Sequence, residues 1–310
     1  MSEYIAVDIG GTRMRAACYP VDSLNPQKIK KISTRHSDES TWDRLVRLIR
    51  SIWPDDRKVN AIGVAVPGPL DPFQGVLFAA PNIPEWKNIP LARLLQDEFG
   101  VPIMMGNDAN LAALGEWNFG AGKGHHHLVY ITVSTGIGGG VIVDDRLLLG
   151  SRGLAAEFGH ITVESNGPLC SCGQRGHLEA LASGPAIARW VEDELSRGTQ
   201  SSLSKQKTVN TKEIAEAASK NDPLAVNALA RAGAFIGTAI ADILHLFNPT
   251  IVIIGGGVSL SGELLMANVR NSMHKHVMNA HYLDNLVLTT ADLGDDTGLL
   301  GALALARQQS

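Results

Sequence analysis

Cysteine and aromatic residues are both scarce in this sequence. Only three cysteines occur in 310 residues, and aromatic residues make up 5%. Three cysteines are too few for the disulfide framework that holds small secreted domains together. Hydrophobic residues, at 45%, supply ample material for one large or two ordinary apolar cores. The fold therefore depends on packing and not on covalent cross-links.

Strong net charge and long apolar runs are also missing. The 27 basic and 31 acidic residues give a net charge of −4, and no Lys/Arg block stands out, which argues against a nucleic-acid partner. Apolar runs such as Ile251–Ile254 end in glycines, far short of the roughly 18 residues that span a bilayer. The N-terminus enters a strand-like run at once, which leaves no room for a signal peptide. We expect a cytoplasmic protein without a membrane partner.

Glycine, in contrast, is plentiful and clustered. Short β-branched runs end in glycine clusters at Gly10-Gly11, at Gly136–Gly140 and at Gly255–Gly257, which is the pattern of buried strands that lead into tight turns. Helical periodicity separates these runs. The expected helices are 41–52, 91–99, 110–117, 185–195, 211–219, 223–247 and 297–307. Alternating strands and helices predict an α/β chain. The polar segment Ser196–Asn210 is expected to be an exposed loop of no chemical interest.

The first glycine cluster follows a carboxylate at the end of a predicted strand, in Asp8-Ile-Gly-Gly-Thr12. Backbone N–H groups in such a turn can hold phosphate oxygens, and Asp8 could hold the water shell of Mg²⁺ beside them. A simple hairpin turn explains the same residues equally well. The motif alone leaves both interpretations open.

The second cluster, Thr132–Gly140, adds hydroxyls at Ser134 and Thr135 to a run of small residues. Its spacing matches neither the Walker pattern nor the Rossmann fingerprint. Two phosphate turns in two halves of the chain favour a nucleotide clamped between two lobes. The third cluster, at Gly255–Gly257, offers a flat surface suited to an adenine or a ribose.

Asn107-Asp108 stands between a predicted strand and a predicted helix. A carboxylate at this position could accept the proton of an attacking hydroxyl in phosphoryl transfer. Asn and Asp are also favoured helix N-caps, so a purely structural role is an alternative.

Two cysteines and two histidines have spacing suited to a metal. His160, Cys170, Cys172 and His177 could supply four tetrahedral ligands to a structural Zn²⁺; two buried thiols and two surface histidines are the alternative. Glu157 and Glu179 bracket these residues and could accept hydrogen bonds from sugar hydroxyls. The run His125–His127 is expected to be a solvated turn without a role.

Taken together, the motifs resemble the ROK family (repressor, open reading frame, kinase). The matching segments are Asp8–Thr12, Pro67–Pro69, Pro81–Trp86, Asn107-Asp108, Ser134–Gly140, Glu157–His160 and Cys170–Gly176. The resemblance implies an α/β fold of the actin-like, ribonuclease-H-like type, with two domains and the active site in the cleft between them. It implies a small domain over residues 1–120, completed by a C-terminal helix at about 297–310, and a large domain over residues 121–296 that carries the zinc motif.

The resemblance also implies transfer of the ATP γ-phosphate to the 6-hydroxyl of a hexose, with glucose the expected substrate. Asp108 would be the general base. The sugar would be bound by Gly68, Asn82, Asn107, Asp108, Glu157, His160 and Glu179. The nucleotide would be bound by Asp8, Gly10, Gly11, Thr12, Arg13, Ser134, Thr135, Gly136, Gly138, Gly139, Gly256 and Gly257. ATP, Mg²⁺ and a structural Zn²⁺ are the implied cofactors, and a homodimer or homotetramer is the implied assembly.

This sequence departs from the family pattern at the metal site. The usual motif ends in a third cysteine, and His177 stands at that position here. Kinases of the family that act on N-acetylmannosamine or N-acetylglucosamine share the same motifs and are alternatives. A sugar-sensing repressor is the alternative of another class. It is disfavoured because only seven residues precede Asp8, too few for a helix-turn-helix.

Overall fold

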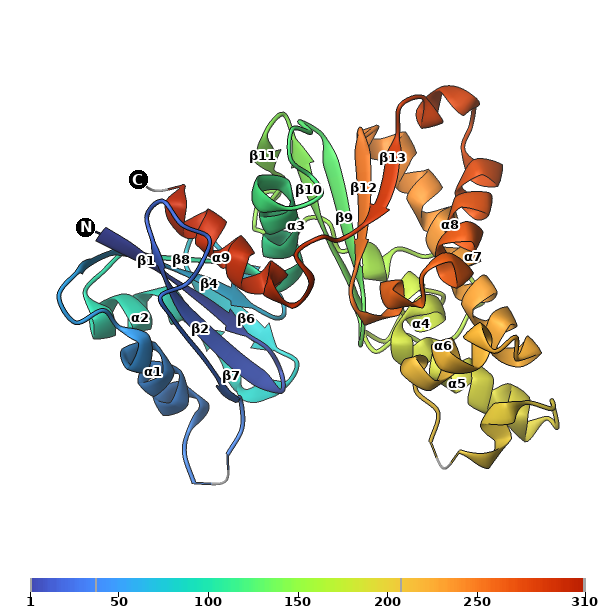
Figure 1. Cartoon of the computed structure of the whole chain (residues 1–310), viewed down its shortest axis with the longest axis horizontal. Helices are drawn as coiled ribbons and strands as arrows, with labels where there is room; N and C mark the ends of the chain where they lie inside the picture. Colours follow the sequence, from blue (N-terminus) through green and yellow to red (C-terminus); the bar gives the residue numbers. More distant parts are fainter. Residues whose placement is uncertain (1, 37, 207, 309–310) are drawn as a thin grey trace.

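A computed structural model describes residues 2–36, 38–206 and 208–308, and its main feature is a pair of five-stranded sheets (Figure 1). The first sheet has the order β3-β2-β1-β4-β8. Its strands are β1 (Ser2–Ile9), β2 (Arg13–Pro20), β3 (Lys28–Ser33), β4 (Lys58–Val66) and β8 (Ile103–Asn107). β1 to β3 form an antiparallel meander, and β4 and β8 run parallel to β1.

The second sheet repeats this topology, with the order β11-β10-β9-β12-β13. Its strands are β9 (Leu128–Val133), β10 (Ile137–Val143), β11 (Arg146–Leu147), β12 (Ile251–Gly255) and β13 (Val287–Thr290). β9 to β11 form the meander, and β12 and β13 run parallel to β9. The α/β class is confirmed. We call the sheets, each with its covering helices, the first and second lobes.

The first lobe is completed by a small antiparallel sheet and two helices. The sheet has the order β5-β6-β7, from β5 (Leu70–Asp71), β6 (Val76–Ala80) and β7 (Ile83–Ile89). Helices α1 (Thr41–Ile52) and α2 (Leu91–Phe99) bury apolar residues in one core with β1, β2 and β4. Both helices have the bounds that apolar periodicity predicts.

Two helices, α3 (Asp108–Phe119) and α9 (Thr297–Arg307), lie between the sheets (Figure 1). α9 packs on β1 and β4, whereas α3 packs on β10 and on α9. Glycines permit this close approach: a Cβ on Gly63 would lie 1.9 Å from the Ala302 carbonyl oxygen, and one on Gly301 would lie 1.9 Å from that of Leu111. The two helices and both sheets thus share one apolar core. Residues 309 and 310 of the expected C-terminal helix lie outside the described residues.

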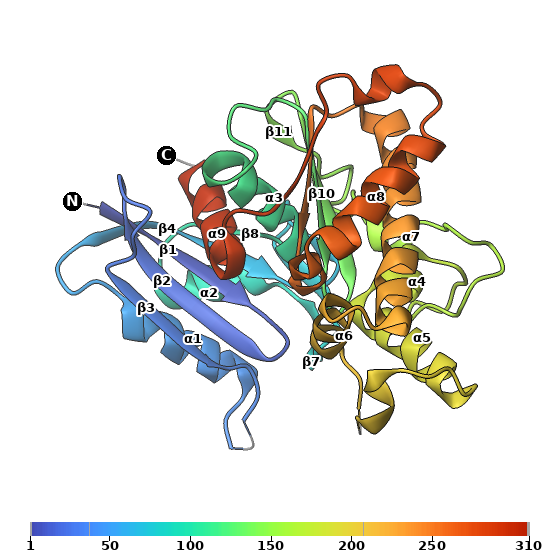
Figure 2. The ribbon, with the colours of Figure 1, turned by 45° about the vertical axis from the view of Figure 1, so that its right-hand side comes forward.

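The second lobe carries the remaining helices on the outer side of its sheet (Figure 2). They are α4 (Leu178–Ala182), α5 (Gly184–Ser196), α6 (Thr211–Ser219), α7 (Pro223–Phe247) and α8 (Glu263–His276), and short 3₁₀ turns span Phe158–His160, Ser202–Lys205, Gly257–Ser261, Ala280–Leu283 and Gly294–Asp296. Neither α4 nor α8 was expected from the sequence.

Helix α7 is a long, apolar helix with the bounds that the sequence predicted. With 25 residues and a mean hydropathy of 1.5 in its most apolar window, it is long and apolar enough to cross a membrane, although no such segment was expected. In the structure its apolar side packs against α8, α6 and α4, and residues such as Ile236 and Ile240 are fully buried. It has the packing of a core helix.

The described residues of Ser196–Asn210 are mostly exposed, as expected, but two of them are buried. Leu203 and Val209 are buried, and the Ser201 and Ser202 hydroxyls donate hydrogen bonds to the Asp222 carboxylate that caps α7. The segment is therefore anchored to the second lobe, and its last two residues line a cavity described below.

Candidate active site

Asp8 and Asp108 stand at the carboxyl ends of two parallel strands of the first sheet, where α/β proteins bind ligands. Asn107 is the N-cap of α3, because its Oδ1 accepts hydrogen bonds from the backbone N–H groups of Ala109 at 2.9 Å and Asn110 at 3.4 Å. Asp108 is the first residue of the helix. The capping alternative thus applies to Asn107, and the Asp108 carboxylate remains available for chemistry.

Asp108 is exposed to solvent, although surrounding protein atoms reduce the hydration of its carboxyl group. Loss of hydration, helped by the negative charges of Asp8 and Glu157, raises the pKa of Asp108 to about 6, against the lowering effect of a hydrogen bond from the Ala109 N–H. Asp8 belongs to the first lobe and Glu157 follows the second sheet, so carboxylates from both lobes act on the charge of Asp108. A carboxyl group with a pKa near neutrality is suited to accept a proton.

The first glycine cluster is the turn of the β1–β2 hairpin. The Gly10 N–H donates to the Arg13 carbonyl, and the Thr34 hydroxyl donates to the Gly10 carbonyl at 2.6 Å. Gly11 must lack a side chain, because a Cβ there would lie 2.5 Å from the side chain of Asn82. The segment is therefore a hairpin turn, which was one of the two interpretations. It also places Asn82, a candidate sugar ligand, beside the candidate phosphate-binding residues Gly10 and Gly11. Thr12 and Arg13 are exposed.

The second glycine cluster is divided between a turn and a strand. Ser134, Thr135 and Gly136 form the turn between β9 and β10, and the Ser134 N–H donates to the Gly136 carbonyl at 2.8 Å. Gly138 and Gly139 lie within β10, which corrects the expectation of one continuous turn. A Cβ on Gly138 would meet Ala109 of α3 at 2.8 Å, and one on Gly139 would meet Phe158 at 2.3 Å. These two glycines allow close packing against the strand.

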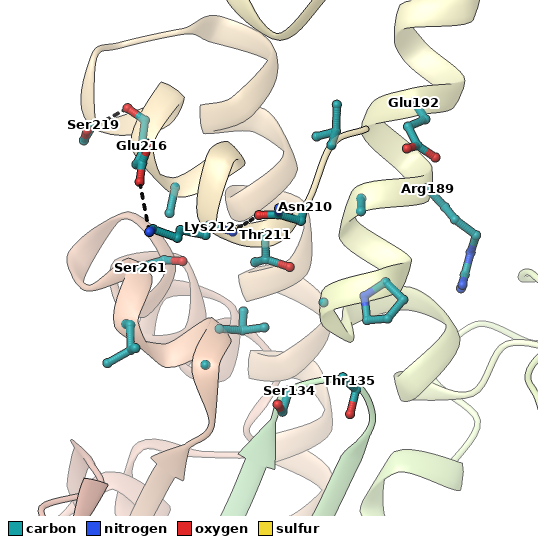
Figure 3. Close-up of a pocket in the computed structure, with 18 residues that line it drawn as sticks. Ser134, Thr135, Arg189, Glu192, Asn210, Thr211, Lys212, Glu216, Ser219 and Ser261 are labelled. Carbon is teal, nitrogen blue, oxygen red and sulfur yellow. Dashed lines mark hydrogen bonds and ion pairs between the residues drawn. The ribbon is translucent and has the colours of Figure 1, made fainter. Parts of the chain in front are cut away.

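Ser134 and Thr135 open into a cavity of about 980 Å³ in the second lobe (Figure 3). Gly257 lines the same cavity, and nothing lies within 4 Å of the position that a Cβ on this residue would take. The chain turns at Gly256, which has a φ of +84° that favours glycine. A Cβ at this position would also lie 2.3 Å from the Val133 carbonyl oxygen. The structure thus brings together the second and third glycine clusters at the ends of the parallel strands β9 and β12.

The opposite wall of this cavity is formed by residues that no sequence motif indicated. α5 contributes Pro185 and Arg189, and α6 contributes Thr211 and Lys212 (Figure 3). Lys212 forms an ion pair with Glu216 of the same helix at 3.9 Å. The helical periodicity of both segments is visible in the sequence, but nothing there indicates that they face Ser134.

The expected metal ligands come together. One ligand atom from each of His160, Cys170, Cys172 and His177 lies within 4.8 Å of the other three. The Cys172 Sγ is 3.2 Å from the His177 Nδ1, and the Cys170 Sγ is 3.8 Å from the His160 Nδ1. Ligand atoms around a tetrahedral Zn²⁺ with bonds of about 2.0–2.3 Å lie roughly 3.3–3.8 Å apart. The four residues therefore fit a zinc ion.

Glu179 connects the loop that carries Cys170 and Cys172, here called the cysteine loop, to the second glycine turn. Its Oε1 accepts a hydrogen bond from the Ser171 hydroxyl at 3.1 Å, and its Oε2 accepts one from the Ile137 N–H at 3.0 Å. Burial raises the pKa of Glu157, and the charge of Glu179 raises it further, against the lowering effect of His160. These two carboxylates and His160 are therefore close enough to influence one another, as a shared sugar site requires.

Gly68 and Asn107 are joined by a hydrogen bond from the Asn107 Nδ2 to the Gly68 carbonyl at 3.2 Å. Gly68 has φ of +99°, and a Cβ there would lie 2.2 Å from the Ala79 carbonyl oxygen. In the run of three histidines, His125–His127, His126 is paired to Asp145 at 2.8 Å. The three residues follow a turn at 121–124 and lead into β9, and of the three only His126 is exposed.

A model of the ROK family matches residues 4–309. The chain belongs to the ROK family. It is 35% identical over 310 residues to a glucokinase from Thermotoga maritima, and the alignment covers 98% of this chain and 97% of that one. It also superimposes with a TM-score of 0.83, at 34% identity and 99% coverage of each chain, on the crystal structure of a ROK family glucokinase from Streptomyces griseus in complex with glucose and AMPPNP.

The family also contains regulators. The xylose repressor of Bacillus subtilis is 34% identical over 297 residues, which cover 96% of this chain but 72% of the repressor. The predicted family and the actin-like, ribonuclease-H-like two-domain fold are thus confirmed. The role of each ROK motif residue in this chain stays a prediction.

Proposed function

We propose that this protein is an ATP-dependent hexose kinase that phosphorylates glucose at the 6-hydroxyl. The observation that carries the proposal is full-length similarity to glucokinases, combined with Asp108 standing among Asp8 and Glu157 at the ends of the sheet strands. The cavity beside Ser134 and Gly257 is at the upper end of the size range of ligand pockets and can accept a nucleotide.

Asp108 orients the 6-hydroxyl and accepts its proton as the bond between O6 and the γ-phosphorus forms. The bond from the γ-phosphorus to the oxygen bridging it to the β-phosphate breaks, and ADP leaves. ATP supplies the phosphoryl group, and Mg²⁺ neutralises the charge of its phosphates. Asp8, Gly10, Gly11, Thr12 and Arg13 in the first lobe, and Ser134, Thr135 and Gly136 in the second, hold the phosphates from two sides.

The sugar would lie against Gly68, Asn82, Asn107, Glu157, His160 and Glu179. Asn82 packs on Gly11, so a sugar held by its amide would have a hydroxyl next to the first phosphate turn. Glu179 is tied to Ile137 and to the cysteine loop, so it would also link the sugar site to the second phosphate turn.

A structural Zn²⁺ would be held by His160, Cys170, Cys172 and His177. Two thiolates and two imidazoles form a stable tetrahedral set, so replacement of the family's third cysteine by His177 preserves the site. Zinc there would fix the loop that presents His160 and Glu179 to the sugar, and would take no part in phosphoryl transfer.

We place the protein in the cytoplasm, as a homodimer or homotetramer.

The test is to incubate the purified protein with ATP, Mg²⁺ and a panel of hexoses and to follow ADP release. Glucose should give the highest kcat/KM, and N-acetylmannosamine and N-acetylglucosamine test the alternatives within the family. Sugar binding without ADP release from any hexose would contradict a kinase and favour a sensor.

A further inference from the structure

Asp8 has a buried cationic partner that no motif indicated. Asp8 on β1 stands directly opposite Arg15 on β2 in the antiparallel register. The Nε and Nη2 atoms of Arg15 donate hydrogen bonds to the same carboxylate oxygen, Oδ2, at 3.1 Å and 2.6 Å. The Arg15 side chain is 16% exposed, whereas Arg13, two residues earlier, is exposed. Such a paired, mostly buried guanidinium holds a carboxylate in one orientation.

Arg15 also reaches the start of helix α9. Its Nη1 lies 3.6 Å from the Oδ1 of Asp296, the residue before the helix. Gly298, in the first turn of α9, lies directly against Asp8, because a Cβ there would be 2.8 Å from the Asp8 Cγ. The free N–H groups of a first helical turn favour a nearby carboxylate. Asp8 is thus held between a guanidinium and a helix N-terminus.

The contacts divide the two oxygens of Asp8. Both hydrogen bonds from Arg15 go to Oδ2, and no described residue donates a hydrogen bond to Oδ1. Asp8 and Asp108 stand at the carboxyl ends of strands that both run parallel to β4, so the Asp8 carboxylate lies at the same edge of the sheet as the candidate base. One oxygen is fixed by the protein, and the other is free for a ligand.

We propose that Arg15 is a positioning residue for phosphoryl transfer, which holds Asp8 by Oδ2 so that Oδ1 faces the hydrated Mg²⁺ of the nucleotide. Through its contact with Asp296, Arg15 also fixes the position of Asp8 relative to the start of α9. This helix enters the first lobe from the second. The inference rests on the proposed function in one respect, the assignment of Asp8 to the nucleotide phosphates.

The first test compares Arg15→Gln with Arg15→Lys and with a matched control, Lys31→Gln. Lys31 is the exposed cross-strand partner of Arg15 on β3, so its replacement removes the same charge one strand further from Asp8. Arg15→Gln should lower kcat by roughly 10- to 100-fold and weaken MgADP binding, measured by calorimetry, while the KM for glucose stays unchanged. Arg15→Lys keeps the positive charge but not the two hydrogen bonds of the guanidinium, so it should recover part of the loss in kcat and in MgADP affinity. Lys31→Gln should behave as the wild type.

The decisive test is a double-mutant cycle with Asp8→Asn, read in kcat and in MgADP affinity. If Arg15 acts through Asp8, adding Arg15→Gln to Asp8→Asn should change either quantity by no more than about twofold. Penalties that multiply would overturn the proposal, because Arg15 would then act independently of Asp8. Wild-type affinity for MgADP in Arg15→Gln would overturn it as well.

These outcomes differ from a failure of the proposed function. If the wild-type chain phosphorylates no hexose, the kinase assignment fails, but the Arg15–Asp8 coupling in MgADP binding is still measurable. If Arg15→Gln does not fold, Arg15→Lys carries the same cycle.

Discussion

Asp108 is the side chain whose surroundings tell most about the chemistry. Its pKa of about 6 lies just below neutrality, because partial burial and two neighbouring carboxylates oppose its charge. At pH 7 the group is mostly ionised and can accept a proton, and its conjugate acid is stable enough to make the transfer favourable. Cap formation is left to Asn107.

Two results are therefore expected for Asp108. Because only the ionised form is a base, kcat/KM for glucose should rise with pH, with a midpoint near 6, and level off above it. Asp108→Asn keeps the shape but not the basicity, so kcat should fall by roughly 10²–10⁴-fold with little change in glucose affinity. Steady-state kinetics across pH and calorimetry check both. Turnover close to wild type in the variant would remove Asp108 from the role.

The metal cluster gives the second prediction at this scale. Cys172→Ala removes one ligand and should lose zinc and weaken glucose binding together, whereas His177→Cys restores the family's usual ligand set and should keep both. Elemental analysis and calorimetry measure the two properties, with one Zn²⁺ per chain expected in the wild type. Cys18→Ser is the matched control, since Cys18 is buried in the first lobe beside Glu3. A fully active chain without bound metal would contradict the proposal.

At the scale of elements, the connection between the lobes depends on one buried carboxylate. Glu116, near the end of α3, is 0% exposed. Its two oxygens accept hydrogen bonds from the N–H groups of Ala121 at 3.0 Å, Asp292 at 3.2 Å and Leu293 at 2.9 Å. Residue 121 follows α3 and residues 292 and 293 precede α9, so Glu116 joins the two chain segments that cross between the lobes.

Glu116→Gln should therefore destabilise the protein. The amide nitrogen of glutamine cannot accept a hydrogen bond from the N–H groups that face it, at a cost of roughly 2–3 kcal/mol in the free energy of unfolding. Urea denaturation followed by circular dichroism measures the change. Glu263→Gln removes an exposed carboxylate that pairs with Arg270 and should change stability by less than about 1 kcal/mol. Equal stability of the two variants would show that the buried hydrogen bonds contribute nothing.

At the scale of the whole molecule, the candidate site is divided between the lobes. The first phosphate turn and Asp108 belong to one sheet, whereas the second turn and Glu157 belong to the other. Water must be excluded from the phosphoryl group during transfer, which requires the lobes to approach each other. Small-angle scattering should show a smaller radius of gyration at saturating glucose. An unchanged radius, with binding verified by calorimetry, would speak against closure.

Assembly is the second property of the whole molecule. Most apolar residues of helix α7 are buried within its own chain, so this helix gives little reason to expect an oligomer. A better reason is a pair of exposed apolar side chains, Leu246 at the end of α7 with 75% exposure and Met278 just after α8 with 72% exposure. His245 accepts a hydrogen bond from the Met278 N–H at 2.9 Å, so the two lie near each other. Light scattering at micromolar concentration should give at least a dimer, and a monomer mass would refute it.

The sequence by itself determined the elements that depend on local patterns. Apolar periodicity gave the bounds of α1, α2, α6, α7 and α9 correctly, because each of these helices buries one face or nearly all of its length. It did not give α8, whose N-cap is a glycine without a side-chain hydrogen bond, or α4, which is only five residues long. The motif residues Asp8, Asp108 and Ser134 were found because strand ends and glycine turns have a local signature.

Only the tertiary structure decided which of these segments meet. Arg15 pairs with Asp8 through strand register, Glu116 binds residues more than 170 positions away, and α5 and α6 face Ser134 across a cavity. None of these contacts produces a periodic pattern in the sequence, because a contact between distant residues depends on two single positions. The glycines of β10 show the same limit: their clustering suggested a phosphate turn, and packing against α3 and Phe158 accounts for Gly138 and Gly139.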